Sequence, residues 1–474
     1  MFDNATRQPS MTSRPVVPAA SGTGGAWPWA ILALLAATFL VLWPLLRGIV
    51  AATDDLQLLM FRYDYPSFVA ALRGAWCQTL FRPLAVVSGF LTDPVTRSCR
   101  LVIPLHALGL AVGALGLDSM VKARLGAGAT NRYAVLALWL LHPATSVSFW
   151  QMDTVSQTAS AAAGIWLMAL SLNAWRPRHR TMAWFLVTCI GLLTKETFLG
   201  WVLAGGIIGA YAGWRDHAWS ERKGEIVGAA AALIFVALRL SVWDVDVMFF
   251  GKKQYSVHLG MPTVYNIALS AAGLLTYGPL HSLRLSKPTE LPWIIAALGA
   301  AGHVSVLVLA GRQAWLAIAR WWGIALLVLS PVLLMEHVSE LYLCGPNALV
   351  ALALVEASTR TSIGWRPAAR VSTVVMIAVA CVGHLTRAAH FDQTWSYARK
   401  LTEQVERIAV SPKMTAPEER CSAPGVYHSV YVVSPVAALG PKVTPMLMQR
   451  RGRPLPADWL SRLDCVGLGE RSSW

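Results

Sequence analysis

Charge is what this sequence has least of. Only 14% of its 474 residues are Asp, Glu, Lys or Arg, and hydrophobic residues make up 55%. A soluble domain carries about 25% charged residues, and the mean hydropathy of this chain is positive, at +0.50. The composition excludes an ordinary soluble enzyme and predicts an all-α, polytopic membrane protein.

Other signatures are absent as well. The chain shows no internal repeat, no glycine-rich nucleotide loop and no histidine cluster at metal-ligand spacing, so we expect no metal and no cofactor. Acidic residues are scarce: 25 Asp and Glu stand against 40 Lys and Arg, for a net charge of +15. In a membrane chain, basic short loops and contact with anionic lipids explain this excess better than nucleic acid does.

Long apolar runs are abundant. The first, Trp27–Val50, is long enough to span a bilayer and lacks a clear signal-peptide cleavage site, so we expect a retained anchor. Further apolar segments cover residues 101–117, 133–150, 157–174, 182–195, 197–213, 225–242, 292–310, 323–335, 345–357 and 371–386. Together they predict a bundle of about eleven transmembrane helices.

Basic clusters fall in alternate gaps between these segments. They are Arg7 and Arg14; Lys122, Arg124 and Arg132; Arg176, Arg178 and Arg180; Arg215, Arg222 and Lys223; Arg312 and Arg320; and Arg360, Arg366 and Arg370. Short cytoplasmic loops are enriched in Lys and Arg. The alternation therefore predicts a multi-pass protein with its N-terminus inside and its C-terminus outside, on the assumption that the membrane is a bacterial-type cytoplasmic (inner) membrane. The apolar stretch 265–281 would break this parity, so we expect it to be interfacial or re-entrant.

The same pattern predicts three parts of the chain. Residues 1–26, with Ser, Thr, Pro and Gly throughout, are expected to be a disordered cytoplasmic N-terminus. Residues 27–387 are expected to form the transmembrane domain, with 51–100 as its first outer loop. Residues 388–474 are expected to form a small extracytoplasmic C-terminal domain.

The outer segments also carry most of the cysteines. Within the C-terminal domain we expect an amphipathic helix over Trp395–Ile408 and a short strand-like run over Val426–Val433. Four of the seven cysteines fall in outer segments, namely Cys77, Cys99, Cys421 and Cys465. An oxidising compartment would permit two disulfides there, but counting does not decide how, or whether, the cysteines pair.

An acidic pair follows the first apolar run. Asp54 and Asp55 would lie at the membrane surface, where a carboxylate can act as a base on a substrate that arrives from water. Arg62, Arg73 and Arg82 follow in a segment with aromatic residues. The alternative is a solvated loop in which the acids cap an amphipathic helix. The pair alone does not decide between these two interpretations.

Further ionisable residues are expected on the same outer face. They are His142 and Asp153 in LHPATSVSFWQMD, Lys195 and Glu196 in LLTKETFLGW, and Glu336, His337, Glu340 and Tyr342 in MEHVSELYLCGPN. Each has a structural alternative, such as a snorkelling lysine or a hydrogen-bonded buried histidine. Their convergence on one face favours a functional site there.

The order of these motifs along the chain resembles the order of motifs in the GT-C membrane glycosyltransferases. Within them, the similarity is to bacterial relatives of the transmembrane O-mannosyltransferases that carry tetratricopeptide (TPR) repeats. The motifs that match are Asp54-Asp55, Phe81-Arg82-Pro83-Leu84, His142-Pro143, Lys195-Glu196 and, in part, Glu340-Leu341-Tyr342-Leu343. The resemblance covers most of residues 30–390. Two features depart from the family: the repeats after the last helix are missing, which weakens the case for a protein acceptor, and Leu341 replaces an arginine that would contact phosphate.

The resemblance implies a GT-C-like bundle that transfers a sugar, with inversion, from a polyprenyl-phosphate donor to an acceptor hydroxyl on the outer side of the membrane. It implies Asp54 as the catalytic base, with Asp55 as the second choice. The donor-binding candidates are Arg82, Lys195, Arg62 and Arg73, and the orienting candidates are Glu196, Glu340, Tyr342, His142 and Asp153. The implied partners are membrane lipids, the lipid-linked sugar and a glycan, lipid or protein acceptor.

Two other classes of function stay open. A lipid or sugar transporter or flippase would also be basic and polytopic, although such proteins usually show related halves and interrupted midplane helices, which this sequence does not. A non-catalytic GT-C-like scaffold subunit would share the fold, and the residue Leu341 is the main feature in its favour. The gathering of ionisable residues at one surface favours the transferase.

Overall fold

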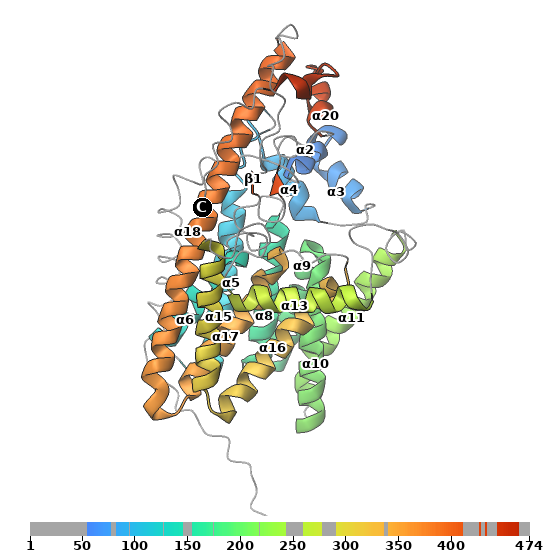
Figure 1. The fold of residues 1–474 in the computed structure, drawn as a ribbon. Helices are drawn as coiled ribbons and strands as arrows, with labels where there is room; N and C mark the ends of the chain where they lie inside the picture. The colour runs from blue at the N-terminus through green and yellow to red at the C-terminus, as the bar shows by residue number, and fades with distance from the viewer. Residues whose placement is uncertain are drawn as a thin grey trace, which may run out of the picture.

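The computed structural model describes most of the chain after the first predicted span. The described residues are 55–76, 82–93, 95–126, 128–145, 154–173, 175–217, 219–242, 259–276, 291–335, 340–410, 426–427, 432–433 and 443–463. They form a tall bundle of helices with a group of shorter helices at one end (Figure 1).

The bundle and the group at its end are built from different parts of the chain. The bundle helices are α5 (Ile103–Leu125), α6 (Ala129–Leu140), α8 (Val155–Leu172), α9 (Pro177–Thr194), α10 (Leu199–Asp216), α11 (Lys223–Leu240), α15 (Leu291–Leu309), α16 (Arg312–Leu333), α17 (Cys344–Arg360) and α18 (Arg366–Val410). The end group, which we call the cap, comprises α2 (Asp55–Asp64), α3 (Phe68–Trp76), α4 (Pro83–Leu91) and α20 (Val443–Arg450). Short 3-10 turns are η2 (Glu196–Phe198), η3 (Trp219–Arg222), η4 (Glu340–Leu343), η5 (Ile363–Trp365) and η6 (Trp459–Arg462).

Six helices of the described residues are long and apolar enough to cross a membrane. They are Ile103–Leu125, Val155–Leu172, Glu196–Arg215, Ala314–Leu333, Glu340–Arg360 and Ile363–Thr386, and Trp293–Leu309 is a shorter apolar helix. The chain is therefore an all-α, multi-pass membrane protein. The first predicted span, Trp27–Val50, lies outside the described residues, so the expected total of about eleven spans stays a prediction.

The helix α17 lies at the centre of the bundle. Every residue from Cys344 to Ser358 is buried, and α17 contacts α5, α6, α8, α15, α16 and α18. A helix that is hydrophobic on all sides suits the centre of a bundle, where other helices cover each of its faces. Because η4 leads directly into α17, this central packing also fixes where η4 lies.

Ion pairs join the basic loops at the end of the bundle opposite the cap. Arg124 at the end of α5 pairs with Glu356 near the end of α17 (Nη2 to Oε1, 2.7 Å). Arg180 at the start of α9 pairs with Glu225 at the start of α11. The basic loops that the alternation of Lys and Arg predicts to share one side of the membrane therefore lie at the same end of the bundle. The side of the membrane that they face stays a prediction.

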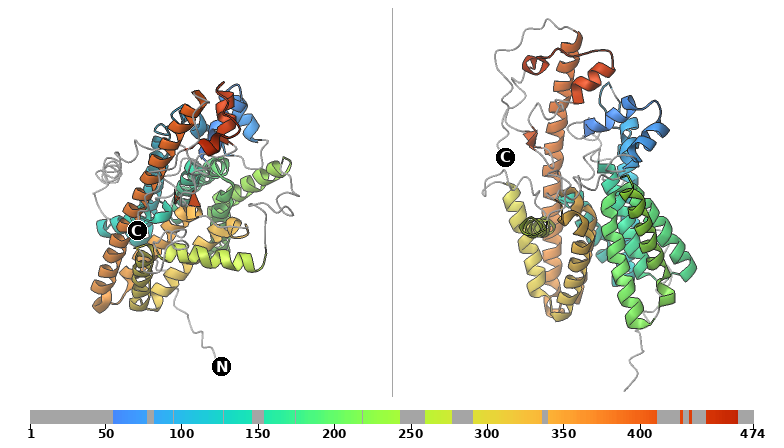
Figure 2. Two further views of the ribbon diagram at one scale, coloured as in Figure 1. Left: turned by 45° about the horizontal axis from the view of Figure 1, so that its top comes forward. Right: turned by 90° about the vertical axis from the view of Figure 1, so that its right-hand side faces the viewer.

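One helix runs across the bundle. The helix α13 (Met261–Thr276) lies at a large angle to its neighbours in Figure 1 and is viewed nearly along its axis on the right of Figure 2. The Nδ2 atom of Asn266 donates to the carbonyl oxygens of Leu333 and Met335, at 3.1 and 2.7 Å, and so ties α13 to the end of α16. This orientation agrees with the expectation that the stretch 265–281 is not a regular span.

The last bundle helix continues far beyond the bundle. The helix α18 is 45 residues long, or about 68 Å at 1.5 Å per residue, whereas the hydrocarbon layer is about 30 Å thick. The last predicted span and the amphipathic helix predicted over Trp395–Ile408 are thus one helix, because no Gly or Pro interrupts residues 384–410. The boundary expected between residues 387 and 388 falls inside α18.

The far end of α18 forms a second, small core. Its buried members are Leu401, Val405 and Ile408 of α18, together with Met448, Trp459 and Leu463. The strand-like run predicted over Val426–Val433 contains two short strands, β1 (Val426–Tyr427) and β2 (Val432–Val433), which pair antiparallel. The described part of residues 388–474 therefore packs around the top of α18, and its status as a separate domain stays a prediction.

Candidate functional site

Arg82 is placed by the proline that follows it. It is the residue before α4, and Pro83 occupies the first turn of that helix. A proline disfavours helical backbone in the residue before it, and Arg82 has the non-helical angles φ −132° and ψ 78°. Arg82 therefore stands just outside the helical part of α4, and 20% of its side chain is exposed.

Lys195 and Glu196 lie in the turn between α9 and α10. Lys195 ends α9 with extended backbone, φ −161° and ψ 140°, and Glu196 begins η2. The turn is anchored by Phe198, which is fully buried and packs so closely over Gly191 that a Cβ atom there would lie 2.3 Å from its ring. Only 5% of Lys195 is exposed. A buried turn thus holds two ionisable residues at the membrane depth where such groups usually mark function.

The side chains of Arg82 and Glu196 form an ion pair with two contacts. Nη2 of Arg82 lies 2.5 Å from Oε1 of Glu196, and Nε lies 3.3 Å from Oε2. The planar guanidinium group suits this two-point geometry. The Lys195 charge also acts on the Glu196 carboxylate. Two cations therefore flank one carboxylate at the cap end of the bundle.

Tyr342 completes this cluster from η4. The Nζ atom of Lys195 lies 4.9 Å from the centre of the Tyr342 ring, a cation–π distance. Tyr342 and Glu340 are both buried, with 7% and 2% of their surface exposed. The structure thus brings together the predicted residues Arg82, Lys195, Glu196 and Tyr342, and places Glu340 on the same short turn as Tyr342.

Hydrogen bonds to the start of α17 hold η4 in position. Nε1 of Trp139, in α6, donates to the carbonyl oxygen of Cys344 at 2.8 Å. Trp201 of α10 packs against Gly345, where an added Cβ atom would lie 2.6 Å from the indole ring. The backbone that carries Tyr342 is therefore fixed by two tryptophans from other helices.

The structure describes the backbone of only one residue of the acidic pair. The helix α2 begins at Asp55, whose side chain is outside the description, and Asp54 lies before the first described residue. Arg62 and Arg73 are exposed near the ends of α2 and α3. The roles of these four residues stay predictions.

The cap is held together by contacts with the C-terminal part. Arg97, of which 3% is exposed, donates through Nη2 to Oγ1 of Thr444 in α20 at 3.3 Å. Burial lowers the pKa of Arg97 to about 10, so the residue is still charged at neutral pH. Arg450 of α20 lies 3.5 Å from Asp64 at the end of α2. The C-terminal part thereby supports the helix that starts at the predicted catalytic pair.

His142 has a structural contact. Only 1% of it is exposed, and its Nδ1 atom accepts a hydrogen bond of 3.0 Å from the backbone N–H of Ala144. This bond stabilises the turn after α6, so an orienting role for His142 toward the donor stays a prediction. Asp153 lies outside the described residues.

The predicted disulfides are not tested. The Sγ atom of Cys99 is buried and lies 3.5 Å from the carbonyl oxygen of Arg97. Cys77, Cys421 and Cys465 fall in parts of the chain that the structure does not describe, so both pairings stay predictions.

A metal site is likewise not tested. Among the described residues, no group of three or more His, Cys, Asp and Glu side chains could hold a metal ion. Asp54 lies outside this search, so the expectation of a site without metal stays a prediction.

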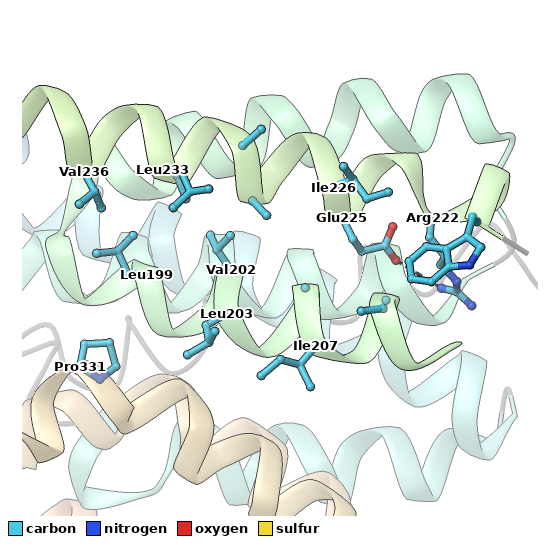
Figure 3. Close-up of a pocket in the computed structure, with 17 residues that line it drawn as sticks. Leu199, Val202, Leu203, Ile207, Arg222, Glu225, Ile226, Leu233, Val236 and Pro331 are labelled. Atoms are coloured by element: carbon cyan, nitrogen blue, oxygen red, sulfur yellow. Dashed lines mark hydrogen bonds and ion pairs between the residues drawn. The ribbon is translucent and has the colours of Figure 1, made fainter. Parts of the chain in front are cut away.

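An apolar groove begins beside the ionisable cluster. It has a volume of about 750 Å³, follows α10 and α11, and has Leu199 and Pro331 at one end and Arg222 and Glu225 at the other (Figure 3). Leu199 directly follows η2, so the groove starts within one helical turn of Glu196. From Leu199 to Ala210 the lined face of α10 is about 16 Å long.

The basic residues that predict the topology have buried acidic partners, which the sequence analysis does not predict. Glu356, Glu225 and Asp118 are 0%, 2% and 4% exposed, and each accepts an ion pair from an arginine of another helix. Arg239 of α11 donates to the carbonyl oxygen of Trp76 and stacks 4.9 Å from its ring, which ties the cap to the bundle. A carboxylate within an apolar run, as in ALALVEAS, was the available signal for such pairs.

Comparisons with known proteins agree with the architecture. The chain matches no family model and no curated protein sequence. In a comparison of structures it has the fold of the GT-C membrane glycosyltransferases. The similar structure is that of ArnT from Cupriavidus metallidurans bound to undecaprenyl phosphate, with 14% sequence identity and a TM-score of 0.50 over 90% of this chain and 89% of that chain. At this identity the similarity shows the fold alone. It confirms the predicted GT-C-like fold and leaves the activity and the resemblance to the O-mannosyltransferase branch as predictions.

Proposed function

We propose that this protein is an inverting glycosyltransferase that moves a sugar from a polyprenyl-phosphate donor to an acceptor hydroxyl on the outer side of the membrane. The observation that carries the proposal is the cluster of Arg82, Lys195 and Glu196 together with an apolar groove whose lining begins at Leu199, three residues after Glu196. A lipid-linked sugar phosphate needs both features: cations for its phosphate and an apolar surface for its chain.

The two cations would stabilise the leaving group. As the glycosidic bond breaks, negative charge grows on the lipid phosphate, and cations already in place lower the energy of that charge without reorganisation. Lys195 is 5% exposed, so its charge acts in a medium of lower effective dielectric than water. Glu196 would keep the guanidinium of Arg82 oriented while the phosphate approaches its outer edge.

The acceptor hydroxyl would need a base. Asp54, with Asp55 as the second candidate, is the proposed base, because Asp55 begins α2 in the cap and Asp54 directly precedes it in the sequence. A positioned carboxylate of this kind contributes about 10²- to 10⁴-fold to the rate. The base would lie on the water-accessible side, from which the acceptor arrives.

The groove would hold the first part of the donor's polyprenyl chain. Its lining is almost entirely apolar between Leu199 and Ile226, and its near end adjoins the proposed phosphate site. ArnT, the structurally similar protein, was solved with undecaprenyl phosphate, which supports a donor of the polyprenyl-phosphate class.

The test uses purified protein and a labelled polyprenyl-phosphate sugar in membrane lipid extract. We expect the wild type to release or transfer the sugar, and Asp54→Asn to bind the donor with its turnover reduced by at least about 100-fold. The same loss in Asp55→Asn alone would move the role of base to that residue. Donor binding without turnover in the wild type would contradict the transferase and favour the scaffold, and absence of donor binding would favour a transporter.

A further inference from the structure

A second cluster of charged residues lies at the opposite end of α17 from η4. At its centre is Glu356, which is fully buried. Its Oε1 atom accepts hydrogen bonds from Nη2 of Arg124 at 2.7 Å and from Nη2 of Arg360 at 2.5 Å. Its Oε2 atom accepts one from Nε1 of Trp321 at 2.8 Å. The carboxylate therefore joins the ends of α5 and α17 to α16.

A third arginine, Arg320, lies within electrostatic reach of this centre, and a fourth, Arg215, lies within reach of Arg320. Arg320 of α16 interacts with Arg124, Glu356, Arg360 and Arg215. Arg215, in the last turn of α10, lies with its guanidinium 5.7 Å from the ring of Tyr211. Four arginines from four helices thus gather near one buried carboxylate, so positive charge predominates in this cluster.

Arg320 is the member of this cluster that faces outward. It is exposed, and within the described part of the chain it makes no ion pair and no hydrogen bond. On the same face of α16, one turn earlier, Leu316 is 65% exposed, and Trp315 beside it is 50% exposed. In a membrane-spanning helix, exposed apolar side chains of this kind face lipid. Arg320 therefore lies at the boundary between the arginine cluster and the lipid.

We propose that Arg124, Arg215, Arg320 and Arg360 form a binding site for the phosphate headgroup of an anionic membrane lipid. Basic pockets between helices at the cytoplasmic end of a bundle suit such headgroups, and guanidinium groups bind phosphate oxygens in pairs. A lipid fits better than free phosphate, because Leu316 and Trp315 supply apolar surface for its chains directly beside Arg320.

The bound lipid would act as a clamp between helices. Glu356 already joins α5, α16 and α17, and Arg215 is the residue that α10 contributes to the cluster. A phosphate that engages Arg215 and Arg320 together would link α10 to the rest. This site is separate from the donor site, since α10 starts at η2 and ends here.

The test measures thermal unfolding of the detergent-solubilised, full-length protein with added lipid. The probes are dioleoylphosphatidylglycerol, dioleoylphosphatidylcholine and inorganic phosphate. A ligand that binds only the folded state raises the unfolding temperature. We expect phosphatidylglycerol to raise the unfolding temperature, and phosphatidylcholine and inorganic phosphate at the same concentration to leave it within error.

The matched variants are Arg215→Gln with Arg320→Gln, and Arg370→Gln as the control at the same end of the bundle. Both cluster residues are exposed, as is Arg370, so the variants should fold. We expect the double variant to need at least about tenfold more phosphatidylglycerol for the same shift, a loss of about 1.4 kcal/mol, and the control to behave as the wild type. If the double variant unfolds on its own, Arg320→Gln alone replaces it.

Equal responses of the cluster and control variants would overturn the proposal, because the lipid would then bind the basic surface without specificity. A shift with inorganic phosphate as large as that with phosphatidylglycerol would overturn the assignment to a lipid. Neither result bears on sugar transfer, so this proposal and the proposed function fail independently.

Discussion

Arg82 and Glu196 are 114 residues apart in the chain, yet their side chains meet in an ion pair with contacts of 2.5 and 3.3 Å. The pair connects the start of α4, in the cap, to the turn between α9 and α10, in the bundle. It therefore does two things at once: it docks the cap on the bundle, and it keeps a guanidinium group beside Lys195.

The two-point geometry of this pair is expected to matter for donor binding. Arg82→Lys keeps the charge but cannot form the fork-shaped contact with Glu196. We expect its affinity for a polyprenyl-phosphate sugar to fall by about tenfold, because hydrogen bonds between charged groups contribute about 1.5–3 kcal/mol and a part of this survives in lysine. The measurement is donor binding to purified protein. Arg399→Lys, on the exposed side of α18, is the control, and equal affinities in the two variants would rule out the role of the pair.

The Tyr342 ring is expected to position Lys195. Tyr342→Phe keeps the ring that lies 4.9 Å from Nζ, whereas Tyr342→Leu removes it. A cation–π contact contributes about 0.5–2 kcal/mol, so we expect the leucine variant to turn over donor about 3- to 30-fold more slowly than the phenylalanine variant. Initial rates at saturating donor give the comparison. If both variants lose the same activity, the hydroxyl group and not the ring is the functional part.

The close contact between α10 and α16 is expected to leave no room for a side chain at Gly200. A Cβ atom on Gly200 would lie 1.9 Å from the carbonyl oxygen of Val328, whereas one on Gly206 meets nothing within 4 Å. Gly200→Ala must therefore push α10 from α16, and we expect it to lower the free energy of unfolding by about 1–3 kcal/mol. Gly206→Ala should be neutral or stabilising by up to about 1 kcal/mol, because alanine favours helix.

Thermal unfolding in detergent distinguishes these two alanine variants. The pair is matched, since both residues lie on α10 and both changes add one methyl group. Similar unfolding temperatures for the two would mean that α10 and α16 do not approach as closely as the structure places them.

The buried carboxylate of Glu356 is expected to be needed for stability. Glu356→Gln removes the charge that offsets Arg124 and Arg360, and breaking a buried pair from one side costs about 3–5 kcal/mol. We expect a marked fall in the unfolding temperature, with Glu403→Gln, at an exposed position of α18, close to the wild type. A wild-type value for Glu356→Gln would show that the two arginines are compensated by other groups.

Much of the architecture was predictable, because it depends on local composition. Apolar runs of spanning length indicate burial in lipid, and this is a property of single segments. The candidates Arg82, Lys195, Glu196 and Tyr342 were found through short motifs, and the structure brings them together. Composition alone does not predict the continuity of α18, because the chain changes from apolar to amphipathic within this helix, although no Gly or Pro is present in residues 384–410.

The partners of these residues could not be predicted, because pairing depends on which helix faces meet. That Arg82 contacts Glu196, or that Arg124 contacts Glu356, follows from the packing of helices more than a hundred residues apart. Hydropathy gives the lipid-facing or protein-facing character of a helix but not its rotation against a particular neighbour. The position of Asp54 relative to this cluster is the part of the site that stays a prediction.

The groove along α10 is expected to hold the donor's apolar chain, and Gly206 offers a way to fill it. Gly206 lines the groove, and an added Cβ atom there would point into open space. Gly206→Phe should therefore fold normally and occupy part of the 750 Å³. We expect its affinity for a long-chain polyprenyl-phosphate sugar to fall by about tenfold or more, since each buried methylene group of a lipid contributes about 0.8 kcal/mol.

The control for this prediction is a donor with a chain of only two isoprene units. A short chain leaves most of the groove empty, so its affinity should be nearly the same in the wild type, in Gly206→Ala and in Gly206→Phe. A loss that is equal for short and long donors would place the effect at the phosphate site instead. No loss with either donor would mean that the chain lies elsewhere on the bundle, because a filled groove cannot also hold it.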